Sequence, residues 1–360
     1  MLLSYFLVFA FRKSVSLKDR DVLSFMLNKT DLKGINNSVK KIIVLTFGIE
    51  FVGALLLFPY FLNNDMTLLE SIYYSVFHSI SAFCNAGFSL FSDSLESFRG
   101  YIGINLIIAG LIIAGGISFS VLTELSSGIT ALFKRQKFKF SINTRVVLNV
   151  TLVLIFGGMF VIYKLEHMNQ LVSYPVYQQY LIAFFQSVTL RTAGFNTISF
   201  GSMRSATLMF TVFIMFIGGA AGSTAGGIKV NTLGVVWAYI QSYKKGADNT
   251  LIYKHVVSKD SILQAFTIII FGMLSIMTMS ILLLITEDAS TMEILFESVS
   301  AFATVGLSTG ITPSLSVIGK LSIIILMFFG RLGPLTLLTA SSRKSKTSRI
   351  SYPEAKILVG

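Results

Sequence analysis

Residues 187–200 read SVTLRTAGFNTISF, a run of hydroxyl, small and glycine residues between apolar stretches. Two other segments have the same pattern, SISAFCNAGFSLF at 79–91 and SVSAFATVGLSTG at 298–310. In each segment a central glycine is followed by Phe or Leu. The central glycines, at nearly equal intervals of about 110 residues, are Gly87, Gly194 and Gly306. Even spacing of this length indicates that the chain repeats one structural unit.

The composition is typical of a helical membrane protein. Hydrophobic residues make up 53% of the 360 residues, and only 13% are charged. A soluble domain cannot bury so large an apolar fraction, whereas a membrane helix requires about 20 apolar residues in succession. Apolar runs that approach or exceed this length occupy 42–62, 101–123, 146–163, 206–219, 262–285 and 321–340. The predicted fold class is therefore an all-α membrane protein.

The net charge of +12 is concentrated in a few polar segments, and the segments between them carry few cations. The basic segments are 12–41, 134–145, 244–259 and 343–356. Because basic loops of membrane proteins remain in the cytoplasm, the alternation predicts a multi-pass protein of the cell membrane with these segments cytoplasmic. Topology and attraction to lipid account for the charge, so no nucleic-acid partner is expected. Three of these segments, 12–41, 134–145 and 244–259, are candidate contacts for a cytoplasmic partner.

Neither metal chemistry nor catalysis is indicated. Cys84 is the only cysteine, which excludes a disulfide within the chain, and the three histidines lack ligand spacing. No nucleophile, base and acid lie together near one membrane face. We therefore expect neither an enzyme nor a resident cofactor.

Each repeat is predicted to contain a spanning helix, a short re-entrant helix, the glycine loop and a second spanning helix. The first spanning helices are expected at 42–62, 146–163 and 262–285, the re-entrant helices at 69–84, 175–190 and 290–303, and the second spanning helices at 101–123, 203–219 and beyond, and 317–340. Irregular backbone at membrane depth is tolerated only where protein buries it or where it lines a watery cavity. The three glycine loops are therefore predicted to surround a central pore.

A cation that enters such a pore must exchange its water for other oxygen ligands, which backbone carbonyls can provide. Glycine permits positive φ, so successive carbonyls can turn toward one axis. No loop contains Asp or Glu, and selectivity would come from carbonyl geometry. The predicted ion ligands are the carbonyls of Asn85, Ala86, Gly87, Thr192, Ala193, Gly194, Thr304, Val305 and Gly306. The alternative is that the glycines only form tight turns between helices.

The segment GGAAGSTAGGIK at 218–229 interrupts the second helix of one repeat, with far too many Gly, Ser and Thr for a helix interior. A phosphate-binding loop does not fit, since Ile228 stands where that motif requires Lys. We predict a flexible loop across the pore that gates access, with close glycine-mediated helix packing as the alternative. The candidate gate residues are Gly218, Gly219, Gly222, Ser223, Thr224, Gly226, Gly227 and Arg331.

Three ionisable residues in apolar surroundings need partners. Arg331, within LMFFGRLGPLTLL, is expected to contact carbonyls or hydroxyls of 218–227, although snorkelling to the membrane surface is an alternative. Arg191 precedes its filter directly and is expected to donate to loop carbonyls. Glu50 requires a polar partner that the sequence does not identify.

In combination, HSISAFCNAGFSLFSDSL, SVTLRTAGFNT, GGAAGSTAGGIKVNT, AFATVGLSTGITPSLS and FFGRLGPLTLL resemble the Trk/Ktr/HKT superfamily of potassium transporters. Within it, the chain is most similar to the membrane subunit of bacterial Ktr potassium-uptake systems. The resemblance implies four repeats around one potassium path, an intramembrane gating loop at 218–228, a homodimer with one pore in each protomer, and a cytosolic nucleotide-binding regulatory ring. Two features depart from the family pattern: Cys84 replaces an asparagine, and most of a first repeat is missing.

The predicted boundaries follow from the period. Residues 1–40 would be the end of a truncated first repeat plus a linker, 41–140 a second repeat with its filter near 85–88, 141–258 a third with its filter near 192–196, 259–342 a fourth with its filter near 304–308, and 343–360 a basic cytoplasmic tail. Stepping back one period from the first filter glycine leads beyond Met1, so a misassigned start or a truncated gene is expected. A filter ring that lacks one side could not complete the shell of a cation.

The expected function is potassium uptake across the cytoplasmic membrane by the ion-translocating subunit. K⁺ is the expected transported ion, Na⁺ remains open as a coupling ion, and nucleotide is expected only on the partner ring. Two alternatives remain. One is a sodium transporter of the same superfamily, which the three intact filter glycines disfavour; the other is a non-conducting truncated membrane protein.

Overall fold

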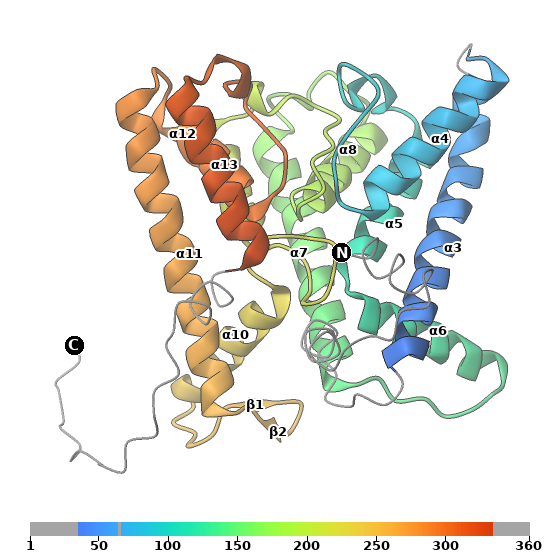
Figure 1. Ribbon diagram of the computed structural model, residues 1–360, viewed down its shortest axis with the longest axis vertical. Coiled ribbons are helices and arrows are strands. Elements are labelled where there is room, and N and C mark those ends of the chain that lie inside the picture. The colour runs from blue at the N-terminus through green and yellow to red at the C-terminus, as the bar shows by residue number, and fades with distance from the viewer. Residues whose placement is uncertain (1–34, 64–65, 334–360) are drawn as a thin grey trace.

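The computed structural model describes residues 35–63 and 66–333, which form an almost entirely helical bundle (Figure 1). Its helices are α3 Ile35–Leu62, α4 Leu68–Phe83, α5 Ile102–Gly116, α6 Phe119–Phe133, α7 Ile142–Glu166, α8 Val176–Thr189, α9 Ser205–Phe216, α10 Val230–Lys244, α11 Lys259–Thr286, α12 Thr291–Ala303 and α13 Val317–Leu332. Three short 3₁₀ turns, Glu96–Phe98, Phe200–Ser202 and Thr312–Ser314, and a hairpin of β1 Leu251–Ile252 and β2 His255–Val256 complete it. The predicted first-repeat segment up to residue 34 and the basic tail lie outside the described residues.

The order of a long helix, a short helix, a glycine loop and a second helix occurs three times. It runs through α3, α4 and α5, through α7, α8 and α9, and through α11, α12 and α13. Within the described residues, Lys40–Leu62, Ile142–Glu166 and Lys259–Thr286 are long and apolar enough to cross a membrane, and the bent pair α5 and α6 can supply a fourth span. The short helices α4, α8 and α12 lie in the upper half of Figure 1, whereas α6, α10 and the hairpin lie at its lower end.

One expected helix is interrupted. The apolar run 101–123 predicts a single span, but the helix ends at Gly116 and resumes at Phe119 after a bend of 111°. At the break Ser118 adopts φ 80°, and the carbonyls of Gly115 and Gly116 accept hydrogen bonds from Thr224 N–H (3.2 Å) and Ala220 N–H (2.9 Å). These acceptors are therefore used by a distant loop instead of by the next turn of the same helix.

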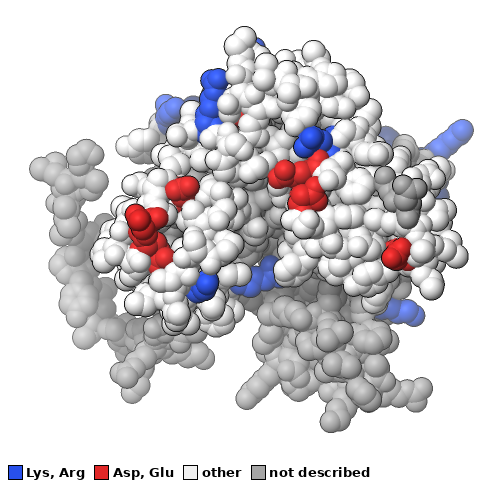
Figure 2. All heavy atoms as spheres, turned by 90° about the horizontal axis from the view of Figure 1, so that it is seen from above, with Lys and Arg blue, Asp and Glu red and all other residues white. Residues whose placement is uncertain are grey.

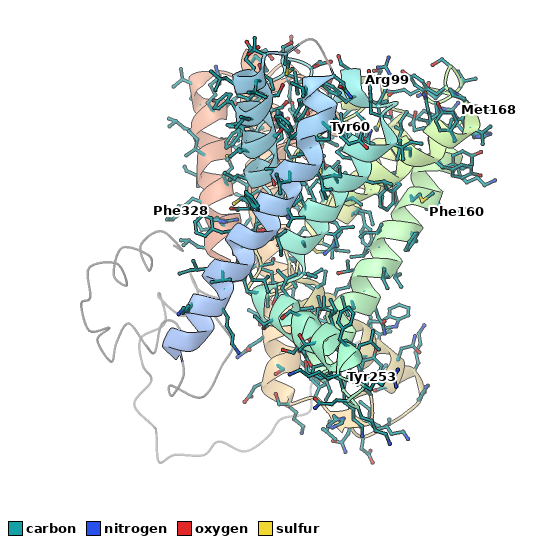
Figure 3. All side chains as sticks on the ribbon, turned by 90° about the vertical axis from the view of Figure 1, so that its right-hand side faces the viewer. Tyr60, Arg99, Phe160, Met168, Tyr253 and Phe328 are labelled. Atoms are coloured by element: carbon teal, nitrogen blue, oxygen red, sulfur yellow. The ribbon has the colours of Figure 1, made fainter. Side chains whose placement is uncertain are left out.

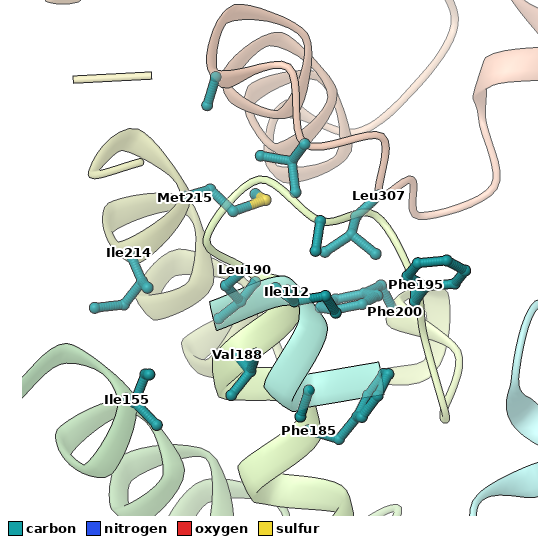
Figure 4. Packing of buried hydrophobic residues seen from close by; sticks show 14 of the residues in the cluster. Ile112, Ile155, Phe185, Val188, Leu190, Phe195, Phe200, Ile214, Met215 and Leu307 are labelled. Carbon is teal, nitrogen blue, oxygen red and sulfur yellow. The ribbon is translucent and has the colours of Figure 1, made fainter. Parts of the chain in front are cut away.

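Side-chain exposure follows the pattern of a membrane bundle. Large apolar side chains on the long helices point outward, as Phe160 and Phe328 do in Figure 3. The centre is formed by α8 and its glycine loop, where Phe185 and Phe195 are fully buried and belong to the same hydrophobic cluster as Ile112 of α5 (Figure 4). The most completely packed part of the molecule is therefore the part that holds the glycine loops.

In two repeats a carboxylate at the end of the long helix caps the start of the second helix. Glu166, the last residue of α7, accepts the N–H of Arg204 (3.0 Å), and Glu287, just after α11, accepts the N–H of Ser316 (2.8 Å). A negative charge at a helix N-terminus is stabilising because the helix dipole is positive there. Both contacts fix the spacing of the two helices that flank a filter loop.

We expect the Glu287 contact to make stability sensitive to acid. The Ser316 hydroxyl, and then its backbone N–H, hold the pKa of Glu287 below its usual range. Such a carboxylate contributes stability above its unfolded pKa of about 4.3, and this contribution is lost as the pH falls through the lowered folded value. In thermal unfolding of detergent-solubilised protein, Glu287→Gln should lose less stability than the parent between about pH 6 and about pH 3. Asp288→Asn, at the exposed neighbouring position, is the control; equal acid sensitivity of Glu287→Gln and the parent would contradict the prediction.

Candidate ion pathway

The three glycine loops meet at one place, although they are far apart in the sequence. A Cβ placed on Gly87 would lie 2.5 Å from the Ala193 carbonyl oxygen and 2.8 Å from the Gly194 Cα. A Cβ on Gly194 would lie 2.5 Å from the Val305 carbonyl oxygen and 3.1 Å from the Gly87 Cα, and one on Gly306 would lie 3.8 Å from the Gly194 Cα. The backbones of the loops are thus close neighbours, and a side chain at Gly87 or Gly194 would not fit between them.

The three loops also share one backbone conformation. In each, the residue two positions before the glycine is left-handed, and so is the glycine itself. The values are Asn85 φ 49°, Thr192 φ 68° and Thr304 φ 53°, followed by Gly87 φ 71°, Gly194 φ 86° and Gly306 φ 87°. Left-handed conformations are uncommon outside glycine, so a threefold recurrence identifies one repeated motif instead of three unrelated turns.

The carbonyl oxygens of this motif have no internal partners. Within residues 35–63 and 66–333, none of the nine predicted ligand carbonyls accepts a hydrogen bond. Four of these residues are buried, namely Asn85, Thr192, Ala193 and Val305. Buried backbone carbonyls are nearly always paired, so unpaired ones at these four positions suit a site where another species supplies the positive charge. The structure therefore brings the predicted ligand residues together, with carbonyls that remain available to a cation.

A hydroxyl residue on each short helix holds its loop at two points, and the sequence interpretation missed these residues. The carbonyl of Thr189 accepts the Ala193 N–H (3.0 Å), while the Thr189 hydroxyl donates to the Phe195 carbonyl (2.6 Å). The corresponding residues in the other repeats are Ser81 and Ser300. A signal was present, because a hydroxyl residue precedes each central glycine by five or six positions.

Above the filter, the loops of two repeats interlock. The Leu95 N–H donates to the Asn196 carbonyl (3.0 Å), and the Asn196 side-chain amide donates to Glu96 (2.7 Å). Burial, and then the nearby charge of Asp93, raise the pKa of Glu96. In the next pair of repeats Gly201 closely approaches Thr309, since a Cβ there would lie 2.5 Å from the Thr309 carbonyl oxygen. These contacts tie adjacent filter loops to one another.

Residues 217–229, here named the crossing loop, separate α9 from α10 and lie in the centre of Figure 1, drawn yellow. A parallel bridge closes its neck, where Gly218 N–H donates to the Ile228 carbonyl (2.9 Å). Its tip lies directly against the filter, because Gly226 N–H donates to the Thr192 hydroxyl (3.3 Å) and a Cβ on Gly226 would lie 2.5 Å from the Ala303 carbonyl oxygen.

The crossing loop also contacts the repeat that contains α4 and α5. The Thr224 hydroxyl donates to the carbonyls of Gly115 (2.9 Å) and Phe83 (3.3 Å), in addition to the backbone bonds at the α5 break. The loop therefore touches all three described repeats where their glycine loops begin. Because it is not helical, it can change conformation without breaking a helical hydrogen-bond ladder.

Two cations hydrogen-bond to carbonyls of the crossing loop, one from α13 and one from within the loop. Arg331 of α13 donates from Nη1 to the Thr224 carbonyl (2.7 Å), which is the kind of partner expected for it from the sequence. Lys229, at the end of the loop, donates from Nζ to the Ala225 carbonyl (2.7 Å). The sequence interpretation did not assign a role to Lys229.

The other two ionisable residues differ from each other in outcome. Glu50 has a partner, the thiol of Cys84, whose Sγ lies 3.8 Å from Oε1. Arg191 is only 3% exposed, but in the described part of the chain its Nε and Nη2 make no hydrogen bond. The expectation that Arg191 donates to loop carbonyls is therefore wrong for these two atoms.

Comparison with known proteins identifies the family of the chain. Residues 1–350 match the profile of the TrkH family, described as cation transport protein. Ktr system potassium uptake protein B of Bacillus subtilis is 37% identical over the whole chain, which covers 80% of that protein. Potassium/sodium uptake protein NtpJ of Enterococcus hirae is 34% identical over 97% of the chain and 77% of its own length.

A solved structure has the same fold. The potassium transporter TrkH from Vibrio parahaemolyticus superposes with a TM-score of 0.69 at 19% identity, over 90% of this chain and 68% of that one. At this identity the likeness concerns the fold alone, but the family profile and the relatives above extend over nearly the whole sequence. The chain belongs to the TrkH family of cation transport proteins.

Proposed function

We propose that this chain is the ion-translocating subunit of a Ktr-type system and carries K⁺ across the cytoplasmic membrane into the cell. The observation that carries the proposal is the meeting of three like glycine loops whose nine ligand carbonyls lack hydrogen-bond partners in the described residues. The relatives support it, since two of them are named as potassium and potassium/sodium uptake proteins.

Carbonyls of Asn85–Gly87, Thr192–Gly194 and Thr304–Gly306 replace part of the hydration shell of the ion. Carbonyl oxygens attract an alkali cation without the stronger hold of a carboxylate, so the ion can also leave. The positive φ of each glycine turns the loop so that the carbonyls of neighbouring loops approach one another. Selectivity then depends on how firmly the backbone maintains these positions.

The crossing loop acts as the gate beneath the filter. It contacts the lower end of the filter through Gly226 and is held there by Arg331 and Lys229. A loop of small residues can withdraw by changes in a few backbone angles, which is how hinge segments open and close a path. The guanidinium of Arg331 also adds positive charge below the filter, which opposes cation passage while the loop is closed.

The distribution of charge favours one direction of approach. Figure 2 shows carboxylate side chains gathered on the upper face. The acidic residues at the upper ends of the helices include Glu70, Asp93, Glu96, Glu166, Glu287, Asp288 and Glu293, and the basic residues at the same end are fewer, among them Arg99, Lys164, Arg204 and Lys320. Negative charge around an entrance raises the local concentration of cations. The basic lower segments 134–145 and 244–259 then face the cytoplasm, where a nucleotide-binding ring would dock under a homodimer of this chain.

Expression in a bacterium that lacks its own potassium uptake tests the proposal. Because a cation needs a closed ring of carbonyls, the chain is compared with a version that carries an in-frame first repeat in front of it. We expect the version with four glycine loops, together with a Ktr-type ring subunit, to restore growth at low K⁺, whereas Gly194→Asp in that version, expressed to the same level, should not. A growth defect that persists with the well-expressed four-loop version contradicts the proposal and indicates a non-conducting protein. Rescue that requires Na⁺ would support sodium as the coupling ion, and Na⁺ uptake without K⁺ uptake would identify a sodium transporter.

A further inference from the structure

We propose that the hydroxyl residues Ser81, Thr189 and Ser300, here named the brace residues, are positioning residues that set the ion selectivity of the filter. They do not contact the ion; they act on the carbonyls that do. This inference rests on the proposed function, because selectivity has meaning only if the loops carry an ion. It adds a specific device to that function, built in the same way in each described repeat.

Each brace residue fastens both ends of its own loop. Its backbone carbonyl accepts the N–H of the middle filter residue, at 2.9 Å for Ala86 and 2.8 Å for Val305. Its hydroxyl donates to the carbonyl of the residue that follows the filter glycine, at 2.8 Å for Phe88 and 2.6 Å for Leu307. The Thr189 brace repeats both bonds. One side chain thus fixes where the loop leaves the helix and where it turns away from the glycine.

The brace hydroxyls bond differently from most helical hydroxyls in the described residues, although Ser79 and Ser187 also donate outside their own helices, to the carbonyls of Glu50 and Ile155. A hydroxyl in a membrane helix ordinarily donates to the carbonyl four residues earlier, as Ser75 does to Ser71 and Ser322 does to Ile318. The brace hydroxyls instead donate forward, to a carbonyl six or seven residues later. Satisfying a buried hydroxyl does not require this, because the nearby helical carbonyl is always available. We therefore attribute the forward bond to the loop: it fixes the carbonyl that follows the glycine.

The effect of the forward bond is to keep the neighbouring ligand carbonyls in place. With the Phe195 carbonyl bonded to the helix, the loop cannot rotate that peptide inward, and the Thr192–Gly194 carbonyls keep their positions. Thr189 is fully buried and Ser300 is 3% exposed, so water does not compete for either bond. A filter whose carbonyls cannot move inward coordinates the smaller Na⁺ poorly, whereas a loosened one can contract around it. Removal of a brace should therefore admit Na⁺ more than it slows K⁺.

The test compares two serines on the same helix. Ser300→Ala removes a brace hydroxyl, whereas Ser298→Ala removes a fully buried hydroxyl that has no hydrogen-bond partner within the described chain. Purified full-length protein in liposomes takes up radiolabelled Rb⁺, and the concentrations of Na⁺ and K⁺ that halve uptake give a selectivity ratio. We expect Ser300→Ala to reduce the ratio of the Na⁺ to the K⁺ concentration about fivefold and Ser298→Ala to leave it unchanged.

A second pair guards against a variant that folds poorly. Thr189→Ser keeps the brace hydroxyl and should keep the parent ratio, whereas Thr189→Val, of the same shape, should reduce it. A merely structural role would lower protein yield or total flux but would not move the ratio of two ions. If any variant carries too little flux, the difference in melting temperature between KCl and NaCl supplies the same comparison.

The outcomes separate the two levels of the argument. Equal ratios for Ser300→Ala and Ser298→Ala, or for Thr189→Val and Thr189→Ser, overturn the brace assignment and leave the proposed transport function intact. A parent protein that neither takes up Rb⁺ nor is stabilised by K⁺ overturns the transport function, and the brace assignment with it.

Discussion

Gly194→Ala should reduce potassium uptake by about two orders of magnitude, the loss expected when groups around a reacting or bound atom shift by roughly an ångström. The added Cβ would lie 2.5 Å from the Val305 carbonyl oxygen and 3.1 Å from the Gly87 Cα, in the centre of the three loops. Both neighbours are backbone and cannot rotate away, so a filter carbonyl must move. The measurement is Rb⁺ uptake per molecule of protein at the membrane.

The matched control for this variant is Gly246→Ala. Gly246 has φ +62° and so carries a comparable backbone strain, but no atom lies within 4 Å of the position that a Cβ would occupy. Alanine in a left-handed conformation costs about 1 kcal/mol at either site, whereas only Gly194→Ala adds a clash. Uptake by Gly194→Ala that is no lower than that of Gly246→Ala would show that the closeness of the loops is unimportant.

The three glycine loops could be predicted from the sequence because their signal is local and repeated. Each loop carries its own glycine, and three like loops at even spacing imply a common role even before any contact is known. The same holds for the short helices, whose observed bounds Leu68–Phe83, Val176–Thr189 and Thr291–Ala303 nearly coincide with the expected ones. These helices could be located because each lies between a long apolar helix and a glycine loop, in a stretch too short to cross the membrane and return.

Features that depend on distant contacts were missed. The break after Gly116 lies within an apolar run and leaves no local signal. The N–H groups that donate to the carbonyls at the break belong to Ala220 and Thr224, about a hundred residues further along the chain. The pairing of Glu50 with Cys84 is equally non-local. Sequence patterns report which face of a helix is apolar, but not which polar groups of separate repeats meet in the centre.

The brace residues show an intermediate case. Their hydroxyl groups recur before each glycine, but the default interpretation of a membrane serine or threonine is a bond to its own helix. The forward donation to Phe88, Phe195 and Leu307 became visible only in the structure. The available signal was a serine or threonine five or six positions before each central glycine. Because it recurs with the glycine loop in each repeat, it points to a role in that loop.

Arg331→Ala should increase potassium flux about fivefold while folding stays nearly unchanged. The Arg331 guanidinium donates to the Thr224 carbonyl of the crossing loop (2.7 Å), and its side chain is otherwise exposed. A hydrogen bond from an exposed charged group contributes about 1 kcal/mol, which corresponds to roughly a fivefold change in the balance between closed and withdrawn loop. Loss of the positive charge below the filter acts in the same direction, because it no longer opposes the cation.

Two variants separate the hydrogen bond from the charge. Arg331→Lys keeps the charge but loses the planar donor, so flux should lie between that of the parent and that of Arg331→Ala. Arg204→Ala is the control, since Arg204 also donates to one carbonyl, that of Met168 (3.3 Å), but at the upper end of the molecule. Flux measured per correctly inserted molecule excludes effects of expression. A loss of folded protein with unchanged flux per molecule would show that Arg331 only stabilises the bundle. Another residue would then have to hold the crossing loop closed, and among the described cations Lys229, which donates to the carbonyls of Ala225 and Gly226, is the next candidate.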